Sequence, residues 1–264
     1  MRLLFCTLVM LLVMGWPARL PAGAVSSVTG EPTPLTKLEP HYRASVLRGW
    51  QSFQTSFAVD GVACVDCHLR LESLGRWAAA YPKVEVFDGS SYRVKSLRQV
   101  VLEALERHTD LPRARRIGLV EDLVAFLSWW GEGRVMQPGR SRLLPPPAAD
   151  LALLRVAVRR GEDFVREHWI DGCGACHRLG DGRDPTRAPL DRAASRFPRF
   201  VPAAGGVVSL ETFLAGHLRH SGNEEWSPEC ETVISLSAYL ASLAEATTYL
   251  PGHPGDRSLE QADE

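Results

Sequence analysis

A five-residue pattern occurs twice in this chain, as Cys64-Val65-Asp66-Cys67-His68 and, 109 positions later, as Cys173-Gly174-Ala175-Cys176-His177. Shorter similarities follow both copies in the same order. They pair Tyr81-Pro82-Lys83 with Phe197-Pro198-Arg199, Ser96-Leu97 with Ser209-Leu210, and residues 123–127 (LVAFL) with 236–240 (LSAYL). Four landmarks in one order predict a domain that has been duplicated in tandem.

Apolar residues around each copy recur at intervals of three and four, the spacing of an amphipathic helix. We expect one helix before each cysteine pattern, one after it, and one that closes the domain. The expected helices cover residues 42–55, 97–107 and 119–130, and then 151–168, 210–219 and 232–243. Strand-like alternation is scarce, so the predicted fold class is all-α, with two tandem duplicated helical domains.

Residues 131–150 interrupt this periodicity with three consecutive prolines, Pro145 to Pro147, which favour an extended linker. We therefore expect a first domain over residues 25–140 and a second over 141–250, each of ordinary domain size. The apolar period is lost again from Thr247, and residues 251–264 are expected to form a disordered tail.

The first 24 residues are typical of a secretory signal peptide. Arg2 supplies the basic region, residues 3–13 the apolar core, and Ala22-Gly23-Ala24 a small-residue cleavage site. The apolar stretch that ends at Trp16 is shorter than the roughly 20 residues needed to cross a bilayer. We therefore expect cleavage, no membrane span afterwards, and a periplasmic or secreted protein.

The composition is that of an ordinary globular protein, with 45% hydrophobic and 23% charged residues among 264. The formal net charge is −1, and it becomes −3 without the signal peptide, which holds two arginines and no acid. No basic surplus exists to bind a phosphate backbone. Nucleic acid is therefore excluded as an expected partner.

The CxxCH pattern has a specific chemical use. Two thiols three positions apart form thioether bonds with the vinyl groups of haem, and the adjacent histidine binds the iron. A disulfide or half a zinc site would explain one copy, but two copies at matching places favour two covalently bound haem c groups. The expected attachment residues are Cys64, Cys67, Cys173 and Cys176, and the expected proximal iron ligands are His68 and His177.

The sixth iron ligand has several candidates. In the first domain, His108 lies 40 residues after His68 and continues the apolar stripe of the helix that begins at Leu97. Met136 is the only methionine left after removal of the signal peptide, but it falls in the expected linker.

In the second domain, His217 lies 40 residues after His177 and follows the same stripe. His220 is a rival, because Arg219-His220-Ser221 resembles Arg107-His108-Thr109. The alternative for each of these histidines is an ordinary helix-end residue.

Cys230 has no cysteine partner once Cys6 and the four attachment cysteines are set aside. A buried free thiol, a link to another chain and an iron thiolate ligand all remain open, because nothing in its spacing decides between them.

The order of elements in each domain resembles the small helical c-type cytochromes. The second domain is further similar to the SoxA subunit family of the thiosulfate-oxidising Sox system. The shared features are the CxxCH, Phe197-Pro198, Ser209-Leu210 at a helix start, Ser227-Pro228-Glu229 before a helix that ends Ala238-Tyr239-Leu240-Ala241, and Pro251-Gly252. The first domain shows weaker similarity through Tyr81-Pro82-Lys83 and residues 134–138.

The resemblance implies one important difference. In SoxA-like proteins the helix opened by Ser-Leu ends in a cysteine that binds the iron and carries the sulfur chemistry. The matching positions here are Ala104, with His108 one turn later, and His217. This difference favours a relative kept for electron transfer.

We therefore predict a periplasmic dihaem electron carrier between a dehydrogenase donor and a cytochrome or oxidase acceptor, with a small cytochrome as a further possible partner subunit. The enzymatic alternatives are a SoxA-like thiosulfate oxidoreductase or transferase subunit that uses Cys230, and a dihaem peroxidase with one five-coordinate iron.

Overall fold

The computed structural model describes residues 32–58, 61–68, 71–86, 92–139, 148–179, 188–221 and 226–253. The expected signal peptide, the proline run and residues 254–264 lie outside these ranges. We call residues 32–139 the first half and residues 148–253 the second half. In the described ranges, no helix is both long enough and apolar enough to cross a membrane.

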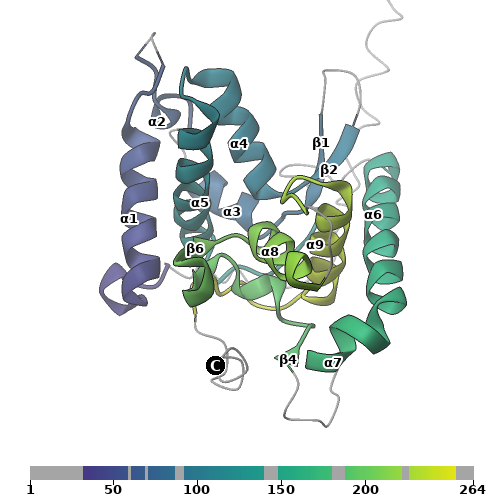
Figure 1. Ribbon diagram of the computed structural model, residues 1–264. Coiled ribbons are helices and arrows are strands. Elements are labelled where there is room, and N and C mark those ends of the chain that lie inside the picture. Colours follow the sequence, from purple (N-terminus) through teal and green to yellow (C-terminus); the bar gives the residue numbers. More distant parts are fainter. Residues whose placement is uncertain are drawn as a thin grey trace, which may run out of the picture.

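Helices make up most of the first half (Figure 1). A short 3-10 turn, η1 (Leu35–Lys37), precedes them. The helices are α1 (Pro40–Gln54), α2 (Cys64–Cys67), α3 (Leu71–Ala78), α4 (Leu97–His108) and α5 (Arg113–Trp130). Between α3 and α4, strands β1 (Lys83–Val86) and β2 (Tyr92–Lys95) pair antiparallel, with Lys83 opposite Lys95.

The second half repeats much of this order. Its α-helices are α6 (Ala148–Glu167), α7 (Gly174–Cys176), α8 (Leu210–Ser221) and α9 (Glu231–Leu243), with a π-helical turn, η2 (Trp169–Cys173), before α7. Two 3-10 turns, η3 (Ala194–Arg196) and η4 (Pro202–Ala204), flank strand β5 (Arg199–Val201). Strand β5 pairs antiparallel with β6 (Gly206–Val208), and β3 (His177–Arg178) pairs parallel with β4 (Ala188–Pro189).

Local sequence explains where the main helices begin. Glu39 accepts hydrogen bonds from the backbone N–H groups of His41 and Tyr42, and Pro40 occupies the first turn of α1. Ser96 and Gln99 form a reciprocal capping box at α4. Ser209 accepts from the backbone N–H of Thr212 and caps α8, while its own backbone N–H donates to Glu121.

Each half contains a close helix crossing at a glycine. Helix α1 packs against α5, and α6 packs against α9 (Figure 1). A Cβ atom on Gly49 would lie 2.0 Å from the backbone oxygen of Asp122, and one on Gly161 would lie 2.2 Å from that of Ser235. Only glycine permits the two backbones to approach this closely, and Asp122 and Ser235 are 113 positions apart.

A short antiparallel bridge joins the two halves at Val135 and Thr248, also 113 positions apart. The hydrogen bonds around it come in matched pairs. The amide of Gly133 donates to the carbonyl of Tyr249 and that of Ala246 to Met136, while Tyr249 donates to Arg134 and Met136 to Thr247. If 113 is added to each residue number of the first half and subtracted from each of the second half, one bond of a pair becomes the other.

Three expectations are corrected here. Residues 131–139 are not an extended linker, because they pair with the second half and bury Met136. The chain also stays packed beyond residue 250, since Pro251 is buried and Gly252 donates to the carbonyl of Pro198. The helical class is confirmed, but short strand ribbons accompany the helices.

One apolar core runs through both halves. Its buried members include Tyr42 and Phe126 from the first half and Leu236 and Tyr239 from the second. The two halves therefore fold against each other and share one core.

Candidate functional site

The first CxxCH forms a single helical turn against α1. The backbone N–H of Ala63 donates to the Asp66 carboxylate at 2.7 Å and closes the start of α2. Cys64 and Cys67 are both free thiols, half-buried and exposed respectively, and three-residue spacing places them on one side of the turn. Burial raises the pKa of the Cys64 thiol.

His68 directly follows this turn, and its ring meets the edge of the Trp77 ring with centroids 5.5 Å apart. His108, its expected partner, is exposed at the end of α4. The expectation that His108 continues the core-facing stripe is wrong, because the buried face of α4 is formed by Leu102 and Leu105 while Ala104 is exposed. The assignment of His108 as an iron ligand stays a prediction from spacing.

The second CxxCH spans η2 and α7. Gly174 lies so close to Trp169 that a Cβ atom would be 2.5 Å from the Trp169 backbone oxygen. Cys173 is half-buried and Cys176 is exposed, as in the first copy. Burial raises the pKa of the Cys173 thiol.

The ring of His177 meets the ring of His217 on α8 edge-on, with centroids 6.1 Å apart and planes at 61°. Phe213, one turn earlier on α8, stacks on His217 with centroids 5.7 Å apart and planes at 18°. Phe197 in turn packs against Phe213, and the Arg199 guanidinium lies over both phenyl rings. Aromatic side chains therefore pack against one side of the His217 ring, although His217 is exposed to solvent.

This spacing fits a metal ion between the two imidazoles. A metal–nitrogen bond to histidine is about 2 Å long, so two rings on opposite sides of one ion have centroids roughly 6 Å apart. The observed centroid separation of His177 and His217 matches this spacing. The side chain of His220 lies outside the described part of the chain.

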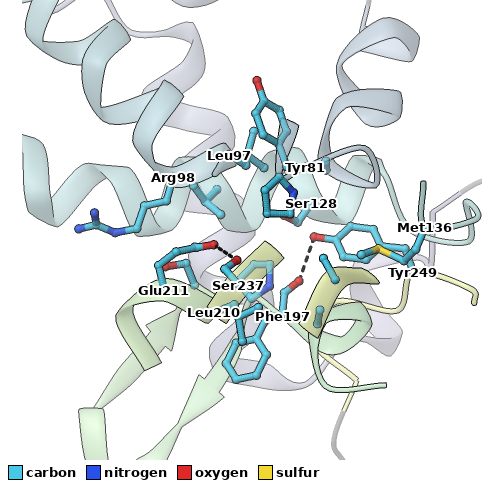
Figure 2. A pocket seen from close by; sticks show the side chains of 17 residues that line it. Tyr81, Leu97, Arg98, Ser128, Met136, Phe197, Leu210, Glu211, Ser237 and Tyr249 are labelled. Atoms are coloured by element: carbon cyan, nitrogen blue, oxygen red, sulfur yellow. Dashed lines mark hydrogen bonds between the residues drawn. The ribbon is translucent and has the colours of Figure 1, made fainter. Parts of the chain in front are cut away.

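The other two candidate ligands lie elsewhere. Met136 is buried where the halves meet and lies beside Tyr249 (Figure 2). Cys230 is a half-buried free thiol at the start of α9, with its backbone N–H bonded to the carbonyl of Ser227.

A small cavity of about 50 Å³ lies at the junction of the halves (Figure 2). Its lining combines positions 113 apart, namely Leu97 with Leu210, Arg98 with Glu211, and Met136 with Tyr249. Sequence reasoning missed the charged members of this set. The only available signal was the occurrence of Arg98 and Glu211 directly after the paired Ser-Leu motifs.

Arg98 is the centre of a buried ion network. Its guanidinium donates to Glu121 of α5 at 2.7 Å and also pairs with Glu229. Glu121 accepts in turn from the backbone N–H of Ser209 and the hydroxyl of Thr212 at the start of α8. The network therefore ties α4 to α8, the two helices that carry His108 and His217.

Comparison with solved structures finds the same overall fold in a chain of the crystal structure of SoxXA from P. pantotrophus. The TM-score is 0.59 at 18% sequence identity, over 80% of this chain and 76% of that one. No family model matches the chain, and no curated protein does either. The likeness to SoxXA shows a shared fold.

Proposed function

We propose that this chain is an exported dihaem c-type cytochrome, built from two tandem duplicated cytochrome c-like domains, that passes single electrons between redox partner proteins. The observation that carries the proposal is the pair of CxxCH motifs, of which the second places His177 opposite His217 at 6.1 Å. The matched helix crossings and the hydrogen bonds related by 113 positions support the duplication.

Each half offers its own attachment set. Cys64 and Cys67 would hold one haem with His68 on its iron, and Cys173 and Cys176 would hold the other with His177. When bound, haem c supplies one-electron chemistry between ferric and ferrous iron. The chain's part is to hold each proximal imidazole beside its cysteine pair and, in the second half, to present the imidazole of His217 from a fixed helix.

Two imidazole ligands favour electron transfer over catalysis. An iron with both axial positions filled by histidine has no open site for peroxide and no thiolate for sulfur transfer. It also lacks the thioether sulfur of methionine that raises the potential of other c-type cytochromes. Both potentials should therefore lie below those of cytochromes with histidine and methionine ligands.

A second candidate is a SoxA-like subunit that acts on thiosulfate, and the fold shared with SoxXA favours it. That chemistry needs a cysteine thiolate, and His217 occupies the position where the resemblance predicts one. Cys230 is the remaining thiol outside the attachment motifs in the described chain. An electron carrier needs no such thiolate, so it accounts for these residues without a role for Cys230. Its partner would be a small cytochrome or an oxidase.

Mass spectrometry tests the haem content directly. The denatured exported protein should carry the mass of two haems and lack residues 1–24. Cys67→Ala should lose one haem, and Cys176→Ala should lose the other. A haem-free chain after export through a competent maturation system would contradict the proposal.

Near-infrared absorption and electron paramagnetic resonance then test the ligands. The oxidised protein should show low-spin iron with two imidazoles and no sulfur-to-iron charge-transfer band. His217→Ala should change the spectrum of the second haem, whereas the matched variant His220→Ala should not. The reverse result would assign the ligand to His220.

A further inference from the structure

Glu211 is a buried carboxyl group at the junction of the two halves. It lies in the first turn of α8, and its side chain accepts a hydrogen bond from the Ser237 hydroxyl at 2.6 Å. Arg98 is the nearest cation in the cavity lining, but its guanidinium points away from Glu211 (Figure 2) and is held by Glu121 and Glu229. The side chain that donates to Glu211 is therefore a neutral hydroxyl, and Arg98 forms no direct ion pair with it.

The cavity beside Glu211 is polar enough and large enough for water. It measures about 50 Å³, and one water molecule needs roughly 10–15 Å³ on the same measure. The Ser128 hydroxyl lines this cavity, is completely buried, and lies near the Tyr249 hydroxyl, which itself donates to the carbonyl of Phe197. A few ordered waters would fit in this cavity beside Glu211.

Helix α8 links this carboxyl group to the second candidate haem. Glu211 and His217 are six residues apart, and six residues of α-helix rise about 9 Å. Six residues also turn the helix by about 600°, so the two side chains leave it about 120° apart. Glu211 and an iron bound to His217 would therefore lie farther apart than the axial rise, at a distance fixed by one helix.

We propose that Glu211 is a redox-linked proton site of the second haem. This inference rests on the proposed function. When a donor protein delivers one electron and ferric iron becomes ferrous, Glu211 takes up one proton from solvent through the junction cavity. When the electron leaves to the acceptor, the proton returns to solvent, so charge is balanced in both directions.

The groups that face Glu211 determine where it titrates. Burial raises its pKa, whereas the hydrogen bond from Ser237 and the positive charge of Arg98 on α4 lower it, and the negative charge of Glu121 on α5 raises it again. Tyr249 faces the same cavity, and burial raises its pKa well above 10, so it stays neutral. The net result is a carboxyl group whose pKa is raised above its ordinary value of 4.5.

The two halves differ at this position. Arg98 on α4 and Glu211 on α8 occupy equivalent positions, 113 residues apart. An arginine stays protonated at all relevant pH values. Proton linkage should therefore affect the second haem and leave the first unchanged.

Redox titration of the holoprotein across a range of pH tests the inference. At an effective dielectric of about 20, one unit of charge roughly 10–15 Å away changes proton affinity about tenfold, or about one pKa unit. A tenfold change corresponds to about 59 mV for one electron. One of the two potentials should fall by about this amount as pH rises through the pKa of Glu211.

Three variants give the controls. Glu211→Gln should abolish the step, and Glu245→Gln, which changes an exposed carboxylate two residues after the end of α9, should preserve it. Ser237→Ala removes a hydrogen bond that lowers the pKa of Glu211, so the step should move to higher pH. Infrared difference spectra between the reduced and oxidised states should show a protonated carboxyl band that is absent from Glu211→Gln.

The outcomes separate this inference from the proposed function. If both haems are present and the step persists in Glu211→Gln, or no step occurs in the unmodified protein, Glu211 is not the proton site while the cytochrome proposal stands. If mass spectrometry finds no haem, both are wrong.

Discussion

Replacing Gly161 with alanine tests the crossing of α6 and α9. The new Cβ atom would lie 2.2 Å from the Ser235 backbone oxygen and 2.7 Å from the Tyr239 Cβ, well inside the about 3.5 Å at which carbon atoms normally touch. Backbone atoms cannot yield as a side-chain end does, so the helices must separate. Overpacking of this kind costs about 1–3 kcal/mol, and alanine recovers about 1 kcal/mol of helix propensity.

Taking the upper part of that range, we expect Gly161→Ala to lower the free energy of unfolding by about 2 kcal/mol. For a protein of this size, that corresponds to a fall in Tm of about 4–8 °C. Thermal unfolding of the haem-loaded protein, followed by circular dichroism, measures it.

Gly118→Ala is the matched control. Gly118 is exposed on α5, and no atom lies within 4 Å of the position of a new Cβ. This change should raise stability by up to about 1 kcal/mol through helix propensity alone. If the two variants shift Tm in the same direction, the close approach of α6 and α9 is refuted.

Further predictions concern charges and the free thiol. Arg98→Met leaves two carboxylates at the junction without their cation and should cost about 3 kcal/mol in urea denaturation, whereas Arg48→Met, at an exposed ion pair, should cost less than about 1 kcal/mol. Because the native pKa of Glu211 is raised above 4.5, its favourable contribution is complete below that pH and is lost as pH rises through the native pKa. Glu211→Gln should therefore gain stability relative to the unmodified protein as pH rises from about 4 to about 7, and a constant difference would contradict this. Cys230→Ser should leave both haem spectra and electron transfer intact; loss of a sulfur-dependent activity would favour the enzyme.

Local sequence signals predicted the helices well. The expected starts and ends of α1, α6, α8 and α9 agree with the structure to within three residues, because each helix combines an apolar stripe with a recognisable beginning or end. Helix α5 starts at Arg113, six residues before its expected start, since its first turns are polar and carry no apolar period. Helix α3 and the strand ribbons were missed because they are short.

The candidate ligands show where local patterns fail. The stripe that contains Leu97 and His108 has the right period for a core-facing surface, yet the helix is rotated so that Leu102 and Leu105 face inward. Periodicity identifies an apolar face only where the apolar positions form one clear stripe. On α4 they are spread over two, and packing against α5 decides between them.

The sequence alone determined the chemistry that this chain can support, because CxxCH places two thiols and an imidazole together through spacing within one helical turn. It also determined the helical class and predicted the internal repeat, because both are local or periodic properties. Only the tertiary structure brought His217 opposite His177, joined Val135 to Thr248, and buried Glu211 beside a cavity shared by both halves. These contacts join residues 40 to 113 positions apart, and they depend on which helix faces meet when the two halves close on one core.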